Sequence, residues 1–304
     1  MVVLLPVDGQ ILLNPPKNAG IISVNVDLVN VLFTVRDRRG GYVKDLRKED
    51  FEILENGRKQ EIRQFARDLD TPLVVSILID TSGSVAQVLP EEQAAARKFL
   101  REVIRPADKA LLASFSSHIA VWQDLTSSLP QLNAALEKTA DPIDPRKAGE
   151  FRARGGTLLF DAVSLVAREK LRKQPGRKAM IILTDGLDNG SIATANSASK
   201  DAIESDTVIY GIHYAADRLQ KDNSGLAALR KLTEPTGGRT FHVDDENKLD
   251  AIFADIQEEM RSQYAIGFKP ADEVRDGSFR KLEVRSRKSG MKVTTRSGYF
   301  AVSK

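Results

Sequence analysis

The sequence predicts an α/β fold: a doubly wound, mostly parallel sheet that is inserted in a β-sandwich-like domain formed by the N- and C-terminal strands. Three observations predict it. Residues 73–80, LVVSILID, are apolar on both strand faces, which is typical of a central parallel strand covered by helices. Strand and helix patterns alternate from about residue 72 to residue 263. Strand patterns without helices lie on both sides of that region.

These patterns divide the chain into three predicted parts. They are an irregular N-terminal arm over residues 1–20, a discontinuous β-sandwich-like domain over residues 21–71 and 264–304, and an α/β domain over residues 72–263. The arm is expected to be irregular because Pro15, Pro16 and Gly20 lie among polar neighbours.

The region before residue 72 predicts strands only. Residues 22–35 have a strand-like alternation of side chains. Asn56-Gly57 is the dipeptide best suited to the positive backbone angles of a tight hairpin turn, and apolar residues precede and follow it. These strands are too few to close a core alone.

The α/β region contains six predicted strands. They cover residues 73–80, 110–115, 119–123, 179–184, 208–214 and 240–243. Helices fit between most of them, for example over residues 91–104 and 158–171. The last helix, over residues 247–261, is the clearest, because its apolar residues recur at helical spacing, with Asp244 or Asp245 available as its N-cap.

Strand patterns return after residue 263, over residues 264–268, 279–287 and 291–300. Neither terminal set of strands can stand alone, since each would leave open edges and an uncovered apolar face. We therefore expect the two sets to pair in one sandwich-like domain.

Composition excludes several classes of protein. The 304 residues are 41% hydrophobic and 29% charged, as in an ordinary globular protein. The net charge of +3 comes from scattered charges of both signs, which predicts no nucleic-acid partner. There is no cysteine for disulfides or thiolate chemistry, and no apolar run of the roughly 20 residues that a membrane helix needs.

The N-terminal residues bear on localisation. The opening MVVLLPVDG is apolar but lacks the basic start and cleavage site of a signal peptide. We expect a secreted or cell-envelope protein whose export signal has been removed, with a cytoplasmic protein as the alternative.

Oxygen-bearing side chains gather where the buried strands are predicted to end. Asp80 ends the first strand, and Ser82 and Ser84 follow it; Asp185 follows the strand over residues 179–184, and Thr157 precedes a helix. Ligands bind at the carboxyl edge of open α/β sheets, so these five side chains are expected to converge there. One hard cation such as Mg²⁺ would fit such a cluster.

The pattern Asp-x-Ser-x-Ser, a distant Thr and a distant Asp followed by Gly resembles a von Willebrand factor A (VWA) domain, a Rossmann-like fold, with a complete metal-ion-dependent adhesion site (MIDAS). Asp80, Ser82, Ser84, Thr157 and Asp185 match it at every ligand position. The flanks, with KEDFEILENG over residues 48–57 and RSGYF over residues 296–300, resemble a bacterial VWFA-related family of acidobacterial type.

The resemblance implies a non-catalytic protein-binding or adhesion module. Ser82 and Ser84 would bind Mg²⁺ directly, with Mn²⁺ or Ca²⁺ as alternatives, Thr157 directly or through water, and Asp80 and Asp185 often through water. Because hydroxyls are neutral ligands, the cation would keep charge that attracts an Asp or Glu carboxylate of a partner protein. The resemblance also implies that binding can shift the last helix, so the β domain could respond to it.

Other interpretations of the same residues remain. Asp80, Ser82 and Ser84 alone could form a helix cap and turn. A Mg²⁺-dependent hydrolase could use the same oxygens, but apart from Asp80 and Asp185 the sequence offers no general base. In a structural scaffold, the metal would only stabilise the fold.

Several further motifs do not match the pattern of a functional site. A phosphotransfer nucleophile at Asp80 would need a second Asp where Ser82 stands, and a serine hydrolase would need Gly two residues before Ser82 or Ser84. Gly155-Gly156-Thr157 lacks the Lys of a phosphate-binding loop, and Asp188-Asn189-Gly190 lacks EF-hand spacing and predicts a turn. The three histidines, His118, His213 and His242, show no metal-ligand spacing and are expected at strand edges or on the surface.

Overall fold

The fold is described from a computed structural model, which describes residues 28–67, 71–140, 156–214, 224–244 and 248–301. The predicted arm over residues 1–20 lies outside the described residues, as does the first part of the predicted strand over residues 22–35.

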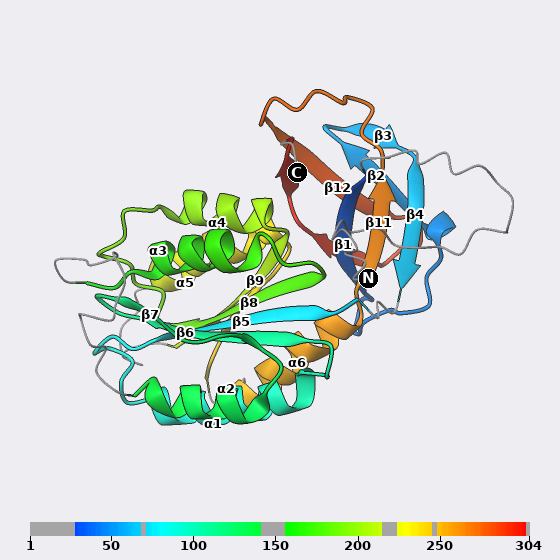
Figure 1. The fold of residues 1–304 in the computed structure, drawn as a ribbon. Helices are drawn as coiled ribbons and strands as arrows, with labels where there is room; N and C mark the ends of the chain where they lie inside the picture. The colour runs from blue at the N-terminus through cyan, green and yellow to red at the C-terminus, as the bar shows by residue number, and fades with distance from the viewer. Residues whose placement is uncertain (1–27, 68–70, 141–155, 215–223, 245–247, 302–304) are drawn as a thin grey trace, which may run out of the picture.

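A six-stranded sheet forms the centre of the α/β part, in the order β10-β9-β8-β5-β6-β7 (Figure 1). The strands are β5 (Leu73–Asp80), β6 (Lys109–Phe115), β7 (Ile119–Thr126), β8 (Arg177–Thr184), β9 (Thr207–His213) and β10 (Thr240–His242). All neighbours pair in parallel except β7, which runs antiparallel to β6 at one edge. The predicted mostly parallel sheet is confirmed.

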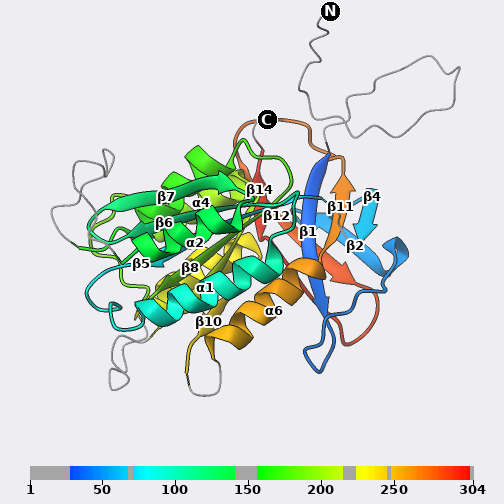
Figure 2. The ribbon, with the colours of Figure 1, turned by 60° about the horizontal axis from the view of Figure 1, so that its bottom comes forward.

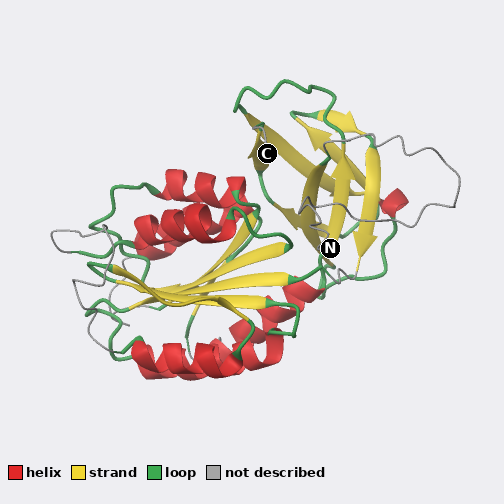
Figure 3. Cartoon of the chain, in the orientation of Figure 1, coloured by secondary structure: helices red, strands yellow, loops and turns green. Residues whose placement is uncertain are grey.

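Helices cover both faces of this sheet (Figure 3). On one face lie α1 (Leu89–Val103), α2 (Leu129–Lys138) and α6 (Leu249–Arg261). On the other face lie α3 (Leu159–Leu165) with its π-helical continuation η2 (Val166–Leu171), α4 (Ala195–Glu204) and α5 (Ser224–Thr233). Each face has its own apolar core, and every residue of β5 is buried between the two.

Two antiparallel four-stranded sheets pack beside the α/β part. One has the order β13-β1-β11-β4, in which N- and C-terminal strands alternate, and the other has the order β14-β12-β2-β3, in which the C-terminal strand β12 pairs with the N-terminal strand β2. The first contains β1 (Val29–Arg36), β4 (Ile62–Arg67), β11 (Tyr264–Phe268) and β13 (Lys292–Thr295). The second contains β2 (Phe51–Glu55), β3 (Arg58–Gln60), β12 (Phe279–Ser286) and β14 (Gly298–Phe300).

One apolar cluster joins the two antiparallel sheets. The rings of Phe33 on β1 and Tyr264 on β11 stack at 5.3 Å, and Phe51 on β2 meets Phe33 edge to face at 4.9 Å. Asn56 and Gly57 have φ values of 48° and 79°, so they make the predicted tight turn between β2 and β3. Two short 3₁₀ helices, η1 (Lys48–Asp50) and η3 (Glu234–Thr236), complete the elements.

Two predictions about local structure were wrong. The predicted strand over residues 291–300 is two strands, β13 and β14, which belong to different sheets. The chain leaves the first sheet at Arg296, and the backbone N–H of Ser297 donates to Pro235 instead of a neighbouring strand, at 2.9 Å. Asp244 does not cap α6, because the helix begins only at Leu249 and its N-cap is Lys248, and the alternative cap Asp245 lies outside the described residues.

A charged cluster joins α6 to the antiparallel sheets. Arg239 lies 2.7 Å from the Glu259 carboxylate and 2.9 Å from Asp255, both on α6. Arg36 at the end of β1 contacts the same two carboxylates, and the Tyr42 hydroxyl donates to Glu259 at 2.8 Å. Figure 2 shows α6 beside α1 and leading towards β11. These contacts fix the last helix to β1.

Candidate metal centre

Asp80 is the buried carboxylate of the candidate centre. It ends β5 and is fully buried, because both faces of the strand are covered. Its Oδ1 accepts a hydrogen bond from the backbone N–H of Ser82 at 2.8 Å, and its Oδ2 accepts one from the Thr184 hydroxyl at 2.6 Å. Thr184, which ends β8, was not expected in the site, and it holds Asp80 in place.

Ser82, Ser84 and Asp185 form a connected group above Asp80. The Oγ atoms of Ser82 and Ser84 lie 3.1 Å apart. The Ser84 hydroxyl donates to Asp185 Oδ2 at 2.6 Å, and the backbone N–H of Leu187 donates to Asp185 Oδ1 at 3.0 Å. Ser84 is exposed whereas Asp185 is buried, so the hydroxyls face solvent and the carboxylates lie behind them.

Thr157 lies in a separate loop that is tied to the same edge. Its backbone N–H donates to Asn189 Oδ1 at 2.6 Å, and the next residue, Leu158, donates to the carbonyl of Ser116 at 2.9 Å, just beyond β6. Gly156 has φ +96°, and an added Cβ would lie 2.5 Å from Asn189 Oδ1. Among the described residues no hydrogen bond joins Thr157 to the other four predicted ligands.

The turn after Asp185 has a structural role. Asp188 accepts a hydrogen bond from the backbone N–H of Phe160, in the first turn of α3, at 3.0 Å. Asn189 accepts one from the backbone N–H of Thr157. The predicted turn at Asp188-Asn189-Gly190 therefore positions the loop that carries Thr157.

Burial sets the electrostatics of the centre. It raises the pKa of Asp80 to about 6, against the lowering effect of hydrogen bonds from Thr184 and Ser82, and the negative charge of Asp185 adds to the rise. Two carboxylates therefore lie close together with hydroxyl and N–H donors as their hydrogen-bond partners. A divalent cation would offset this charge, and an all-oxygen donor set of hydroxyls and carboxylates suits a hard cation.

Glu92 is a buried acid near this centre that the sequence did not single out. It lies on α1, is fully buried, and neither carboxylate oxygen has a hydrogen-bond partner. Burial raises its pKa well above the usual range, and the charge of Asp80 adds to the rise. The signal was its position three, four and seven residues before the buried Ala95, Ala96 and Phe99.

The side chains of His213 and His242 meet, a contact that the spacing of the histidines along the sequence did not predict. Their Nδ1 atoms lie 2.9 Å apart at the carboxyl ends of β9 and β10. Burial lowers the pKa of His213, and the neighbouring His242 lowers it further. Strand order brings the two together, and their positions at the ends of predicted strands were the available signal. Among the described residues, no three His, Asp or Glu side chains form a metal cluster.

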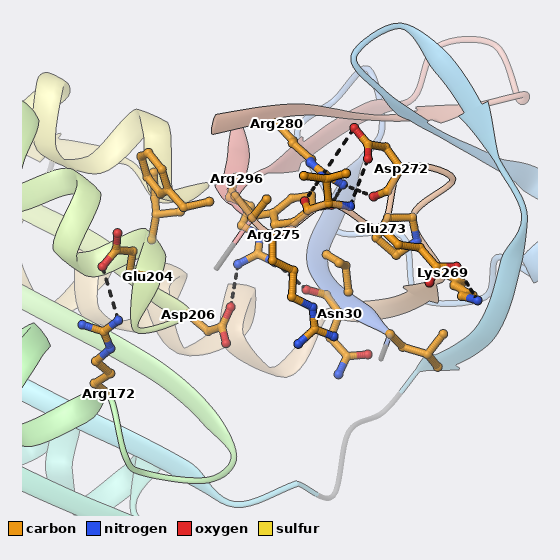
Figure 4. A pocket seen from close by; sticks show the side chains of 18 of the residues that line it. Asn30, Arg172, Glu204, Asp206, Lys269, Asp272, Glu273, Arg275, Arg280 and Arg296 are labelled. Atoms are coloured by element: carbon orange, nitrogen blue, oxygen red, sulfur yellow. Dashed lines mark hydrogen bonds and ion pairs between the residues drawn. The ribbon is translucent and has the colours of Figure 1, made fainter. Parts of the chain in front are cut away.

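A cavity of about 520 Å³ lies elsewhere, beside the amino ends of β8 and β9 (Figure 4). Ion pairs line it: Arg296 lies 2.6 Å from Asp206, and Arg172 lies 3.5 Å from Glu204. Because Asp80 and Asp185 lie at the opposite, carboxyl ends of the strands, this cavity is not part of the candidate centre.

The fold and the sheet-edge cluster define the class of protein. The family model of the von Willebrand factor type A domain matches residues 75–255, which is more than half of the chain. The chain therefore belongs to the von Willebrand factor type A domain family.

Individual relatives are distant. A UPF0353 protein of Mycolicibacterium paratuberculosis is 23% identical over 215 residues, which are 64% of this chain and 63% of that protein. The chain thus spans less than two thirds of the length of this relative.

Two solved structures illustrate the structural neighbours. BatB from Bacteroides thetaiotaomicron has 18% identity and a TM-score of 0.47, covering 62% of this chain and 97% of that chain. Proximal thread matrix protein 1 from the mussel byssus, solved with a zinc-occupied MIDAS motif, has 18% identity and a TM-score of 0.49, covering 66% and 48%. In the part of the chain that the structure describes, no helix is long and apolar enough to cross a membrane.

Proposed function

We propose that this chain is a divalent-metal-dependent protein-binding module, in which Asp80, Ser82, Ser84, Thr157 and Asp185 form a complete MIDAS. Mg²⁺ is the proposed cation, with Mn²⁺ or Ca²⁺ as alternatives. The observation that carries the proposal is the Ser84 hydroxyl, which contacts both Ser82 Oγ at 3.1 Å and Asp185 Oδ2 at 2.6 Å.

The donor set supports capture of a carboxylate. Three of the proposed ligands would supply neutral oxygens, namely Ser82, Ser84 and Thr157. Only Asp80 and Asp185 would then offset the charge of the cation. Such a cation retains attraction for an additional anionic oxygen. Because Ser84 is exposed, an Asp or Glu side chain of a partner protein can approach from solvent.

Burial of the nearby acids supports a non-catalytic role over a hydrolase. A general base must come within hydrogen-bond reach of the proton that it removes. Asp80, Asp185 and Glu92 are all buried. Asp80 already accepts hydrogen bonds from Ser82 and Thr184, and Asp185 accepts them from Ser84 and Leu187. These acids are therefore poorly placed to activate a water molecule at the surface.

The antiparallel sheets suggest the wider context. We propose that residues 21–71 and 264–304 form one domain into which the α/β domain over residues 72–263 is inserted, and that the chain belongs to the bacterial, acidobacterial-type family that its flanks resemble. An adhesion site of this kind suits a secreted or cell-envelope protein, and fractionation of the native source would test that location.

A paired capture experiment tests the function. Wild type and Asp80→Ala are each used as bait in extracts of the native source, with Mg²⁺ or with a chelator. We expect proteins that bind wild type only with Mg²⁺ and that free glutamate displaces. Capture of the same proteins under all four conditions would contradict the proposal.

Thermal unfolding separates the scaffold alternative. If Mg²⁺ raises the melting temperature of wild type but not of Asp80→Ala, and no partner is captured, the metal serves stability only.

A further inference from the structure

A second group of possible metal ligands lies at the same sheet edge as the MIDAS. His213 and His242 are register partners at the ends of the parallel strands β9 and β10, so their side chains leave the sheet on the same face. Their Nδ1 atoms lie 2.9 Å apart and their ring centroids 5.1 Å apart.

The pair continues the row of side chains that holds Asp80. Thr184 on β8 is the register partner of His213 and donates its hydroxyl to Asp80. Burial lowers the pKa of His213, and the carboxylate of Asp185 is near enough for its negative charge to favour the protonated ring and so to oppose that lowering.

The spacing of the nitrogens fits two ligands of one metal ion. With metal–nitrogen bonds of about 2.0–2.1 Å, two ligands at a right angle are about 2.9 Å apart, and two at a tetrahedral angle about 3.4 Å. His213 is buried and His242 is exposed, so one side of the pair is fixed while the other is open to water.

We propose that His213 and His242 form a two-histidine site for a borderline divalent cation such as Zn²⁺, with water completing its coordination. Imidazole nitrogen favours Zn²⁺, Ni²⁺ and Cu²⁺, whereas Mg²⁺ prefers oxygen ligands. The two sites at this edge would therefore select different metals. The competing explanation is a hydrogen bond between two neutral imidazoles, which also allows 2.9 Å.

Zinc titration of the whole chain tests the site, because His118 is the only other histidine and there is no cysteine. NMR of ¹⁵N-labelled imidazoles should show Zn²⁺ shifting the ring signals of His213 and His242 but not of His118. In calorimetry, we expect Zn²⁺ affinity to fall at least about tenfold in His242→Ala, and to stay unchanged in the control His118→Ala.

The variant Asp80→Ala separates this proposal from the proposed function, since it removes a proposed MIDAS ligand and leaves both histidines in place. Retained Zn²⁺ binding in Asp80→Ala supports the histidine site. Loss of all Zn²⁺ binding in Asp80→Ala, with no effect of His242→Ala, would overturn it and assign zinc to the MIDAS. Unchanged His213 and His242 ring signals at saturating Zn²⁺ would also overturn it.

Discussion

Ser84 illustrates how single residues determine the proposed centre. Its hydroxyl touches Ser82 and donates to the buried carboxylate of Asp185. Replacing it removes a proposed metal ligand and a hydrogen-bond donor, yet it lies on the surface, where little packing is lost. Metal binding should therefore suffer more than stability.

We expect Ser84→Ala to lower Mg²⁺ affinity at least about tenfold, while unfolding free energy falls by only about 1 kcal/mol from the lost hydrogen bond. Calorimetric titration and urea unfolding measure the two effects. Ser117→Ala, a partly exposed serine outside the proposed ligands, is the matched control. Equal Mg²⁺ affinity in both variants would exclude Ser84 as a ligand.

Glu92 is expected to destabilise the fold, because its buried carboxyl has no hydrogen-bond partner. Glu92→Met should raise the free energy of unfolding by about 1–3 kcal/mol, the usual penalty for an unpaired buried polar group. The exposed neighbour Glu91→Met should stay within about 0.5 kcal/mol of wild type. A destabilised Glu92→Met would show that the carboxyl has a partner that matters.

The same residue predicts a pH dependence. Burial raises the pKa of Glu92 in the folded state, so the unfolded chain releases this proton first as pH rises. The destabilisation by Glu92 is therefore smallest below about pH 4.3, the ordinary pKa of Glu, and the free energy of unfolding falls as pH rises from there towards the raised pKa. The advantage of Glu92→Met should thus be smaller at pH 4 than at pH 7, and a constant difference would contradict the assignment.

At the scale of elements, the sequence predicts a strand or a turn when neighbouring residues alone determine it. The apolar run of β5 and the Asn56-Gly57 turn were both predictable, because burial on both faces and positive φ leave a direct mark on residue type. The break between β13 and β14 was not, because it depends on a contact of Ser297 with the distant Pro235.

The distinction between local and long-range contacts also applies to the candidate site. Asp80, Ser82, Ser84 and Asp185 could be predicted to converge, because parallel strands end at one edge. The contact of His213 with His242 needed the strand order β8-β9-β10, and the support of Asp80 by Thr184 needed the pairing of β5 with β8. The spacing of residues along the chain does not predict which of these strands are neighbours in the sheet.

The start of α5 is predicted to control the loop that carries Asp185. A Cβ added at Gly225 would lie 1.9 Å from the Asp185 carbonyl oxygen. Gly225→Ala should cost about 1–3 kcal/mol of stability and weaken Mg²⁺ binding, because the loop must move. Gly83→Ala, with open space around the added carbon, should leave stability unchanged in urea unfolding. Comparable stability of the two variants would contradict the tight contact.

At the scale of the whole molecule, the charged cluster around α6 links the α/β part to the antiparallel sheets. Glu259 is buried and contacts Arg239, Tyr42 and Arg36. Any movement of α6 on ligand binding would have to carry β1 with it or break these contacts. Coupling between the two parts stays a prediction, and unchanged hydrogen exchange of β1 and β11 on binding would exclude it.

Removing the central cation of this cluster should destabilise the protein. Arg239→Met leaves the buried Glu259 with Arg36 at 3.4 Å as its remaining cation. We expect a loss of about 3 kcal/mol, since Arg36 alone would compensate the charge of the buried Glu259 only in part. Lys98→Met breaks an exposed pair with Asp250 and should cost less than about 1 kcal/mol. Similar losses in urea unfolding would show that the cluster is not effectively buried.

The most direct measurement is Mn²⁺ binding, followed by electron paramagnetic resonance and by the relaxation of water protons, in wild type and Asp80→Ala. Wild type should bind Mn²⁺ in the MIDAS, and added acetate should lower the relaxation by displacing water from the bound ion, because the centre attracts a carboxylate. Asp80→Ala should lose both effects. Equal Mn²⁺ binding by the two proteins, or no response of wild type to acetate, would contradict metal-dependent carboxylate capture.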